Sequence, residues 1–378
     1  MLVAPVSSAA LFSGTILFDA LLEPLCSQAT QRRSNPISEN TVTTLPSSMR
    51  AAVHNGFGAP DVLQTQSIPL PELRSNDLLV RVHGAGLNRA ELNWRQGNYG
   101  PTPGFGDCDQ VIGLEMAGEV VAMGPQVQGF QAGERVMGIV GGGAYAEYAR
   151  IDAGMAMRVP EGISDIEAAS IPEAMVTAHH VLLHLGNLQA GQRVLIHGAG
   201  GGVGTTLVQM ARMAGASTIV TTSSAGKHDR LRALGVDIAI DYAKQDFAEV
   251  IAREVQGGRV DVVICNMGAL YLERNIRSLD VAGRLVQLGL QGGANGSLPM
   301  DVMMTRRLRI EGTVMKSLST AQKVAMTQRF AERWLPVIAR RELLPLIEKQ
   351  YPLTQAAQAH THLENQQPFG KIVLNCQS

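Results

Sequence analysis

The chain has 378 residues, of which 45% are hydrophobic and 40 are glycine, and its formal net charge is −1 at pH 7. This length is typical of two domains, and so many glycines favour an α/β protein with many turns. The balanced charge offers no electrostatic basis for nucleic-acid binding. No apolar run is long enough to span a bilayer, and the four cysteines stand far apart with no C-x-x-C pair. We therefore expect a cytoplasmic protein with no disulfide framework and no membrane or nucleic-acid partner.

Residues 1–48 differ in composition from the rest, because Ser, Thr, Ala and Leu dominate and Arg32 and Arg33 are the only basic residues. A secretory signal would need a charged start and a stronger apolar centre, and a mitochondrial transit peptide would need more arginine and fewer acids. We interpret the segment as a disordered N-terminal extension. A chain that begins at Met49 is expected to fold and to bind its ligand as well as the full chain.

Short β-type runs follow from residue 49 onward. Alternating or apolar runs, separated by stretches rich in Gly and Pro, cover residues 51–54, 78–83, 113–121 and 134–138. Short strands at such spacing are typical of a partly open β-barrel. We expect the first part of this barrel domain to cover residues 49–174, with a short helical turn at 88–93.

Residues 175–316 alternate between strand and helix patterns. Strands are predicted at 193–197, 217–222, 238–240, 260–264, 284–288 and 308–312, with helices between them, for example at 203–214, 227–234 and 246–256. Six strands in this alternation indicate an α/β fold with a doubly wound parallel sheet. Residues 317–378 begin with a predicted helix at 320–340 and end with a strand at 370–374, which we expect to return to the first domain.

A glycine-rich turn lies between the first strand of this unit and the helix that follows it. Its pattern is Ala199-x-Gly201-x-x-Gly204. Small residues let a diphosphate reach the backbone N–H groups, and the helix N-terminus adds partial positive charge where phosphates bind. A glycine-rich turn with no ligand is the alternative, but the strand–turn–helix context favours a dinucleotide. The candidate cofactor-binding residues of this turn are Ala199, Gly201, Gly202, Val203 and Gly204.

The end of the second strand of the same unit bears on the choice of cofactor. NAD-binding units usually carry an acidic residue there, about 20 residues after the glycines, which accepts hydrogen bonds from the ribose hydroxyls. This chain has Ser223-Ser224-Ala225-Gly226-Lys227 instead, so no carboxylate repels a 2′-phosphate and Lys227 offers a positive charge. The alternative is that Lys227 is a solvated residue that opens the next helix. We predict NADPH rather than NADH.

Several long stretches resemble one known family. They are LNRAELNWRQGNY, IGLEMAGEV, GGGAYAEY, IPEAMVTA, NLQAGQRVLIHGAGGGVG and FGKIVL. From Met49 to the C-terminus the chain resembles the zinc-independent quinone oxidoreductase and zeta-crystallin family of medium-chain dehydrogenases/reductases, most closely its tumour-suppressor-inducible branch. The resemblance implies a GroES-like catalytic domain over 49–174 and 317–378, and a six-stranded Rossmann NADPH-binding domain over 175–316. It also implies a homodimer, in which the open edge strand at 308–312 pairs with its copy across a two-fold axis.

The resemblance implies roles for individual residues as well. Asn88 and Tyr99 match catalytic-site residues near the nicotinamide, and Tyr99 is expected to contact cofactor or substrate and to relay a proton. Thr177 matches a residue that contacts the phosphate–ribose region of the cofactor. Ser224, Lys227 and Tyr242 match residues that contact the 2′-phosphate. Gly289 and Leu290 are expected beside the nicotinamide. Ordinary packing is the alternative for each.

No metal site is expected. Zinc-dependent relatives use a Cys near the position of Asn88 and the His of a G-H-E motif, but this chain has Gly113-Leu114-Glu115, and leucine binds no metal. His179, His180 and His184 lie close together in sequence. Two of them could form a metal pair, but no third ligand is in view. We interpret them as packed or surface histidines rather than as a metal pair.

Without a metal, the chemistry belongs to the cofactor, and a hydride needs an electron-poor acceptor. A quinone or an enone fits, whereas an ordinary ketone would need a Lewis acid or a strong proton donor, and the sequence shows neither. We therefore predict an enzyme that resembles NADPH:quinone oxidoreductases. The alternatives are an enone or enoyl reductase, a zinc alcohol dehydrogenase, and a low-turnover NADPH-binding protein that acts structurally or as a redox sensor.

One stretch departs from the family pattern. Where the family usually has an Asp followed after two residues by Gly-Gly, this chain has Cys265-Asn266-Met267-Gly268-Ala269. This departure puts the local cofactor contacts in doubt. Cys265 is interpreted as a small buried residue, with a reactive thiol as the alternative.

Overall fold

The structure is a computed structural model that describes residues 45–100, 110–366 and 368–377. Almost all of the predicted N-terminal extension therefore lies outside the described residues. Strand β1 (Ser48–His54) begins at the last residue of the expected extension, because Ser48 pairs with Pro69 of strand β2 (Leu63–Pro69). Met49, the next residue, is buried.

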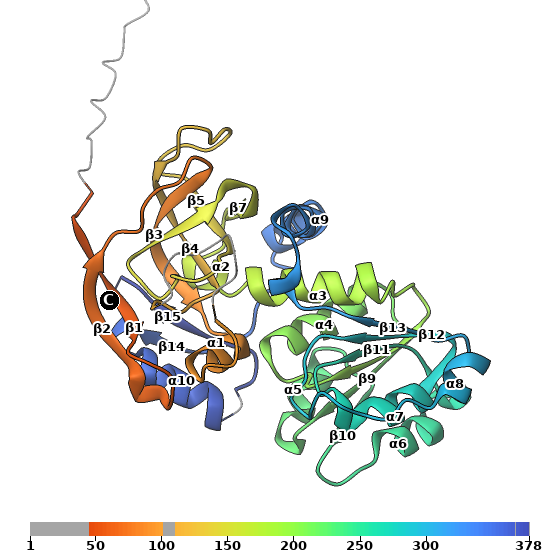
Figure 1. Ribbon diagram of the computed structural model, residues 1–378. Coiled ribbons are helices and arrows are strands. Elements are labelled where there is room, and N and C mark those ends of the chain that lie inside the picture. Colours follow the sequence, from red (N-terminus) through yellow and green to blue (C-terminus); the bar gives the residue numbers. More distant parts are fainter. Residues whose placement is uncertain (1–44, 101–109, 367, 378) are drawn as a thin grey trace, which may run out of the picture. The chain divides into compact units, whose positions relative to one another are not determined.

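The first large sheet is mainly antiparallel, and segments from both ends of the chain build it. Its strand order is β14-β15-β3-β4-β5-β7, with β6 also paired to β3, and Figure 1 shows these strands beside the β1–β2 pair. The strands are β3 (Asp77–Gly86), β4 (Glu115–Met123), β5 (Arg135–Ile139), β6 (Tyr148–Asp152), β7 (Ala156–Arg158), β14 (Ile347–Pro352) and β15 (Lys371–Asn375). Because β15 pairs with β3, the last strand of the chain joins the sheet whose first strands come from the first third of the described residues.

The second sheet is parallel throughout, as the β-α alternation predicts (Figure 1). Its strands are β8 (Arg193–His197), β9 (Thr218–Ser223), β10 (Ile238–Asp241), β11 (Val260–Cys265), β12 (Leu279–Gln287) and β13 (Arg309–Gly312). The order β10-β9-β8-β11-β12-β13 confirms the doubly wound sheet and reverses direction between β8 and β11. In such sheets a ligand crevice lies at the carboxyl ends of the two strands where the order reverses.

Alternate side chains of the parallel strands enter two separate apolar cores. Val194 and Ile196 of β8 pack on the face covered by α4 (Gly202–Met213) and α5 (His228–Ala233). Leu195 packs on the opposite face, which is covered by the helices α6 (Phe247–Glu254), α7 (Ala269–Ser278) and α8 (Met300–Thr305). Burial on both faces explains the continuous apolar runs of these strands. The helices predicted at 203–214, 227–234 and 246–256 are confirmed to within two residues at each end.

Strand β12 differs from the prediction, because it begins at Leu279 rather than at residue 284. Residues 280–282 are not buried, and Ala282 adopts a φ of +60°. The pairing register with β11 also shifts between Val260 and Val262. This irregular start lacks the apolar pattern on which the prediction depends. The sequence therefore predicted only the second half of the strand.

The remaining helices include one unusual segment. They are α1 (Arg89–Arg95), α2 (Asp165–Ala168), α3 (Thr177–His179), α9 (Thr320–Ala339), α10 (Ala356–Asn365) and the short turns η1 (Pro60–Val62), η2 (Ala153–Met155), η3 (Pro172–Val176), η4 (His180–Leu185), η5 (Ala225–Lys227), η6 (Gln256–Gly258), η7 (Met315–Ser317) and η8 (Leu353–Gln355). The segments η3 and η4 are π-helical turns that flank α3. Such turns occur mostly inside α-helices and often at functional sites. The segment carries Glu173 and Thr177.

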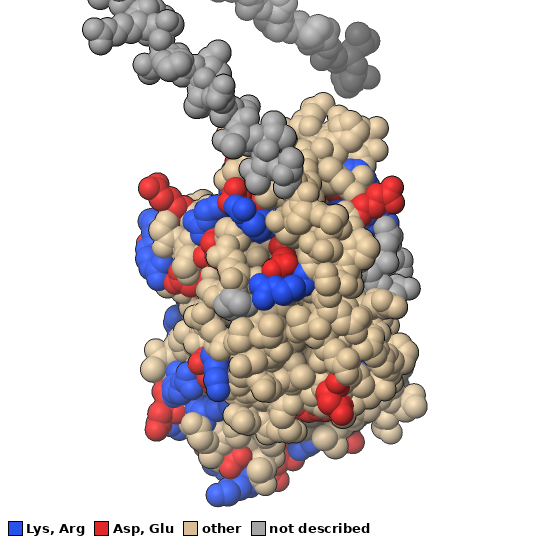
Figure 2. Space-filling view, turned by 90° about the vertical axis from the view of Figure 1, so that its left-hand side faces the viewer, with Lys and Arg blue, Asp and Glu red and all other residues tan. Residues whose placement is uncertain are grey.

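On the face that Figure 2 shows, blue Lys and Arg side chains and red Asp and Glu side chains are interspersed over a largely uncharged surface. Among the residues that the structure describes, no helix combines the length and the apolar character that a membrane span requires.

Candidate active site

The glycine turn lies at the crevice between β8 and β11, and its glycines serve two different purposes. A Cβ on Gly204 would lie 2.5 Å from the carbonyl oxygen of Gly198, so this glycine allows α4 to pack tightly against the turn. A Cβ on Gly201 would meet nothing closer than that same oxygen, at 3.7 Å. Gly201 is the N-cap of α4 and offers no side chain to its first N–H groups. The space beside this helix N-terminus is therefore open to an anionic ligand.

Asn266 occupies the place where the sequence departs from the family pattern. A Cβ on Gly198 would lie 2.6 Å from Asn266 Nδ2, and a Cβ on Gly289 would lie 2.9 Å from the Asn266 carbonyl oxygen. The N–H of Gln291 donates to that carbonyl at 3.1 Å. Asn266 Oδ1 is buried and has no hydrogen-bond partner among the described residues. A buried acceptor without a donor, next to an open helix N-terminus, fits a bound dinucleotide whose ribose carries hydroxyl groups.

Cys265 precedes Asn266 and is buried. Its Sγ accepts a hydrogen bond from the N–H of Met267 at 3.4 Å, and burial raises the pKa of the thiol. A raised pKa disfavours the reactive thiolate. The interpretation as a small buried residue is therefore confirmed over the reactive thiol.

Lys227 crosses the glycine turn instead of extending into solvent. A Cβ on Gly200 would lie 2.4 Å from Lys227 Cδ, and Lys227 Nζ donates to the carbonyl oxygen of Pro368 at 3.2 Å. Burial lowers the pKa of this ammonium group, an effect that the Glu348 carboxylate opposes and Arg230 strengthens. The alternative of a fully solvated lysine is wrong, since the side chain is half-buried.

The other predicted phosphate-side residues lie at neighbouring strand ends. Ser224 follows β9, and Tyr242 follows β10, which pairs directly with β9. The N–H of Tyr242 donates to the Ser223 carbonyl at 3.3 Å, while its side chain is 47% exposed. Ser224, Lys227 and Tyr242 thus gather beside one corner of the crevice, and their contact with a 2′-phosphate stays a prediction.

Gly289 and Leu290 follow β12, on the other side of the crevice. Gly289 packs against Asn266, whereas the side chain of Leu290 is 58% exposed. Thr177 begins α3, which packs against α4, and its side chain is partly exposed. Gly289, Leu290 and Thr177 therefore lie beside elements that border the crevice. Their predicted contacts with the cofactor stay predictions.

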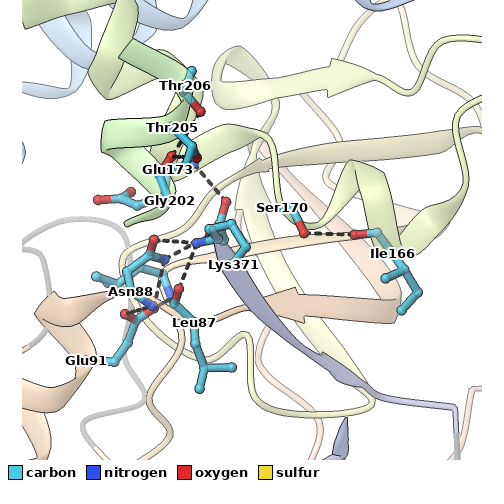
Figure 3. A network of polar contacts seen from close by, with 12 residues as sticks. Leu87, Asn88, Glu91, Ile166, Ser170, Glu173, Gly202, Thr205, Thr206 and Lys371 are labelled. Atoms are coloured by element: carbon cyan, nitrogen blue, oxygen red, sulfur yellow. Dashed lines mark hydrogen bonds and ion pairs between the residues drawn. The ribbon is translucent and has the colours of Figure 1, made fainter. Parts of the chain in front are cut away.

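A buried ionic network joins the barrel sheet to the glycine turn, and Figure 3 shows Lys371 at its centre. Lys371 Nζ lies 2.5 Å from Glu115 Oε1, 2.5 Å from Asn88 Oδ1 and 2.7 Å from the carbonyl oxygen of Leu87. The Lys371 stem also passes beside Gly202, where a Cβ would lie 2.5 Å from its Cδ. The first residue of β15 therefore supports the first residue of α4.

The predicted catalytic residue Asn88 is part of this network. Its Nδ2 donates to Glu115 Oε1 at 2.9 Å and to Glu91 Oε1 at 3.3 Å, while its Oδ1 accepts from Lys371. Both ends of the amide are thus engaged inside the protein. The predicted contact of Asn88 with the nicotinamide stays a prediction.

Leu114 stands where zinc-dependent relatives are expected to carry a ligand. It is buried, and its N–H donates to Glu91 Oε1 at 3.1 Å. Over residues 45–100, 110–366 and 368–377, no three His, Cys, Asp or Glu side chains converge as metal ligands would. The expectation of a zinc-free site stays a prediction.

The three neighbouring histidines have different surroundings. His179 is buried and its Nδ1 accepts from Trp334 Nε1 at 3.0 Å. The His180 and His184 rings stack with centroids 5.2 Å apart. Burial lowers the pKa of both His179 and His180 to about 4, so both are neutral imidazoles at neutral pH. These contacts agree with packed histidines.

A cavity lies beside the network. Its wall combines apolar and polar side chains, namely Leu114, Ile139, Val140, Met155 and Met315 with Tyr99, Glu173, Lys316 and Lys323, together with Gly141. Lys316 Nζ donates to the Tyr99 carbonyl at 2.7 Å and lies 4.7 Å from the centroid of its ring. Burial, together with the Glu173 and Glu91 carboxylates, raises the pKa of the Tyr99 phenol. Tyr99 therefore faces the cavity as a neutral hydrogen-bonding group.

Glu173 is the cavity residue that sequence reasoning missed. Its N–H donates to Glu115 Oε2 at 2.8 Å, and Figure 3 shows it beside the network. Burial raises the pKa of its carboxyl to about 8, with further contributions from the Glu115 and Glu91 carboxylates. A signal was present, because the glutamate of IPEAMVTA stands alone in a buried apolar segment, where an acid is expensive unless it has a function or a partner.

The chain matches known sequence families over most of the described residues. Residues 74–161 match the profile described as alcohol dehydrogenase GroES-like domain, and residues 202–332 match the one described as zinc-binding dehydrogenase. The chain is 32% identical over 335 residues to the quinone oxidoreductase of Lama guanicoe, covering 86% of this chain and 97% of the relative. It is 31% identical over 330 residues to part of a phenolphthiocerol/phthiocerol polyketide synthase of Mycobacterium tuberculosis, a match that covers 86% of this chain but only 15% of that protein.

Solved structures agree with the fold. A structure described as an NAD-dependent alcohol dehydrogenase is 30% identical with a TM-score of 0.76, covering 86% of this chain and 99% of the other. The CurK enoyl reductase is 26% identical with a TM-score of 0.76 and the same coverage of each chain. The parallel sheet is thus confirmed as Rossmann-like and the barrel sheet as GroES-like. On these sequence matches and this two-domain architecture, the chain belongs to the medium-chain dehydrogenase/reductase family of oxidoreductases.

Proposed function

We propose that the chain is an NADPH-dependent, zinc-independent reductase that transfers a hydride to quinones or to related electrophilic carbonyl compounds, including enones. The observation that carries the proposal is the cavity beside the network, whose wall combines apolar side chains with polar groups that include a neutral tyrosine and an acid of raised pKa. Such a wall suits a flat, uncharged carbonyl compound. Likeness to a quinone oxidoreductase and to an enoyl reductase supports both substrate classes.

The reduced nicotinamide supplies the hydride in this proposal, and the protein supplies position and polarity. The open N-terminus of α4 would bind the diphosphate, while Lys371 holds Asn88 at the start of α1. The apolar side chains of the cavity exclude water from the acceptor. Tyr99 offers a neutral hydroxyl group, with its raised pKa, as a hydrogen-bond donor to a carbonyl oxygen.

Turnover on a substrate panel tests the proposal. Purified full-length protein is expected to oxidise NADPH in the presence of an ortho- or para-quinone or a cyclic enone, as followed by nicotinamide absorbance. Binding of NADPH without oxidation across the whole panel would favour the alternative, a low-turnover NADPH-binding protein that acts structurally or as a redox sensor.

The preference for NADPH depends on Lys227. A charge-assisted contact to the 2′-phosphate contributes about 1.5–3 kcal/mol, which is about tenfold or more in affinity. We expect kcat/KM to favour NADPH over NADH in the wild type, and the Lys227→Ala variant to lose about tenfold or more of that ratio. Arg232→Ala removes an exposed cation from the same helix and serves as the matched control. Equal use of both cofactors by the wild type would contradict the preference, and an unchanged ratio in Lys227→Ala would exclude this lysine.

We also propose a homodimer built on strand β13. This strand is the edge of the parallel sheet and is exposed along its length, with Ile310 40% exposed and the nearby Val314 47% exposed. Exposed edge strands invite pairing with another strand unless they are covered. Light scattering at micromolar concentration is expected to give twice the mass of the chain, and Ile310→Lys is expected to give the single mass because it brings like charges together at the two-fold axis. A wild-type monomer would contradict this proposal.

A further inference from the structure

We infer that Glu173 is the proton donor to the substrate oxygen in the cavity, and that the site therefore favours conjugated enones, whose reduction depends on an acid. This inference rests on the reductase function proposed above. It names a residue, and a preference between the two substrate classes, that the family membership does not supply.

The position of Glu173 supports the inference first. It lies in the π-helical turn η3, so its side chain reaches the wall of the cavity while its backbone N–H remains bonded to Glu115 Oε2 at 2.8 Å. Tyr99 and Lys316 belong to the same wall. The wall that an acceptor in the cavity would meet thus holds both an acid and a tyrosine.

Charged groups on four other elements act on Glu173, and Lys316 of η7 lines the same cavity wall. Glu115 on β4 and Glu91 in α1 disfavour its ionised form, whereas Lys371 on β15 and Lys323 on α9 favour it. Lys371 has three N–H donors, and its three close acceptors are Leu87 O, Asn88 Oδ1 and Glu115 Oε1. Its donors are therefore already engaged. Burial is the largest effect on Glu173 and raises the pKa of the carboxyl to about 8, so most of it carries a proton at neutral pH.

The proton transfer balances as follows. A hydride from the reduced nicotinamide forms a C–H bond at the β-carbon of the enone, and the electron pair of the C=C bond moves toward the carbonyl oxygen. The O–H bond of the Glu173 carboxyl breaks, and an O–H bond forms on that oxygen. The enol then rearranges to the saturated ketone, and the Glu173 carboxylate regains a proton from solvent. The substrate is the oxidant and the nicotinamide is the reductant.

The preference between substrates follows from what drives each reduction. A quinone becomes aromatic when it accepts a hydride, so its reduction is favourable with little help from an acid. An enone gains no aromaticity, and charge develops on its oxygen as the hydride arrives. A positioned acid that removes this charge contributes about 10²–10⁴-fold to such a step.

The protonation of Glu173 is measured first, on full-length protein without cofactor. The infrared difference between the wild type and Glu173→Gln is expected to contain the C=O stretch of a protonated carboxyl at neutral pH, which disappears with a midpoint near pH 8. Glu91, whose carboxyl pKa is also raised, interacts with Glu173, so the same difference recorded for Glu91→Gln separates its signal. An ionised carboxylate in that difference at neutral pH would overturn the inference.

Unfolding supplies a second readout that does not depend on turnover. The folded pKa of Glu173, about 8, lies above its ordinary value of 4.5, so the folded state binds more protons than the unfolded state between these two pH values. The wild type is therefore expected to lose stability relative to Glu173→Gln as pH rises from about 4.5 to about 8. Glu161→Gln, at an exposed glutamate, is the matched control and is expected to follow the wild type.

Kinetics then separate the inference from the proposed function. In Glu173→Gln we expect kcat/KM for a cyclic enone to fall about 100-fold, and that for a para-quinone to fall less than about tenfold. An equal fall for both substrates, or no fall, would overturn the role of Glu173 while the reductase function stands. If the wild type reduces neither substrate, the proposed function fails and the proton-donor role fails with it, even where the infrared result holds.

Discussion

Replacing Lys371 by methionine is expected to lower the free energy of unfolding by about 3–5 kcal/mol, because it leaves buried carboxylates without their counter-charge. Lys371 and Glu115 are 3% and 0% exposed and lie 2.5 Å apart, with Glu91 close by. Denaturant unfolding at neutral pH measures the loss. The loss is expected to shrink as pH falls, since protonated carboxyls need no neighbouring cation.

Two further variants define the cause. Arg253→Ala breaks an exposed ion pair with Glu254 and is expected to change stability little. The double variant Lys371→Met with Glu115→Gln removes both charges of the pair and is expected to recover part of the stability that Lys371→Met loses. If Lys371→Met unfolds at the wild-type denaturant concentration, the network does not stabilise the fold as described.

The variant Gly201→Ala is expected to fold normally and to bind dinucleotide at least about tenfold more weakly, a loss of about 1.4 kcal/mol or more. Gly201 has a φ of −85°, which alanine readily adopts, and the added Cβ would have its nearest neighbour at 3.7 Å. The same Cβ would stand between a diphosphate and the first N–H groups of α4. Calorimetric titration with NADPH and thermal unfolding of the apoprotein measure the two effects separately.

Two other glycines provide contrasts. Gly204→Ala would place a Cβ 2.5 Å from the Gly198 carbonyl oxygen and 2.6 Å from the Ala199 Cα, so it is expected to lower the melting temperature as well. Gly312→Ala meets nothing within 4 Å and serves as the control for a glycine-to-alanine change outside the crevice. Unchanged dinucleotide affinity in Gly201→Ala would remove the open face of the turn from the binding site.

The sequence predicts well those features that depend on neighbours in the chain. The strands of the parallel sheet are buried on both faces, so their apolar runs are visible in the sequence itself, as in Val194–Leu195–Ile196. The glycine turn is recognisable because the close packing at Gly204 and the open space at Gly201 are local to one strand, one turn and one helix. The start of β12 was missed for the same reason, since its first residues lack the buried pattern.

Only the tertiary structure decided which residues far apart in the sequence contact one another. Lys371 meets Glu115 across 256 positions and Asn88 across 283, and no local pattern marks that meeting. Lys227 reads in sequence as a helix-opening residue, yet it donates to Pro368, 141 positions away. Glu173 is marked in the sequence only as a lone acid in an apolar segment, and its raised carboxyl pKa comes from burial beside Glu115 and Glu91. Hydrophobic periodicity and backbone sterics are properties of short segments, so the sequence alone determined the fold class and the dinucleotide turn. Desolvation and the charge of neighbours depend on the folded surroundings, so the acid of the cavity and the network behind it became visible only in the tertiary structure.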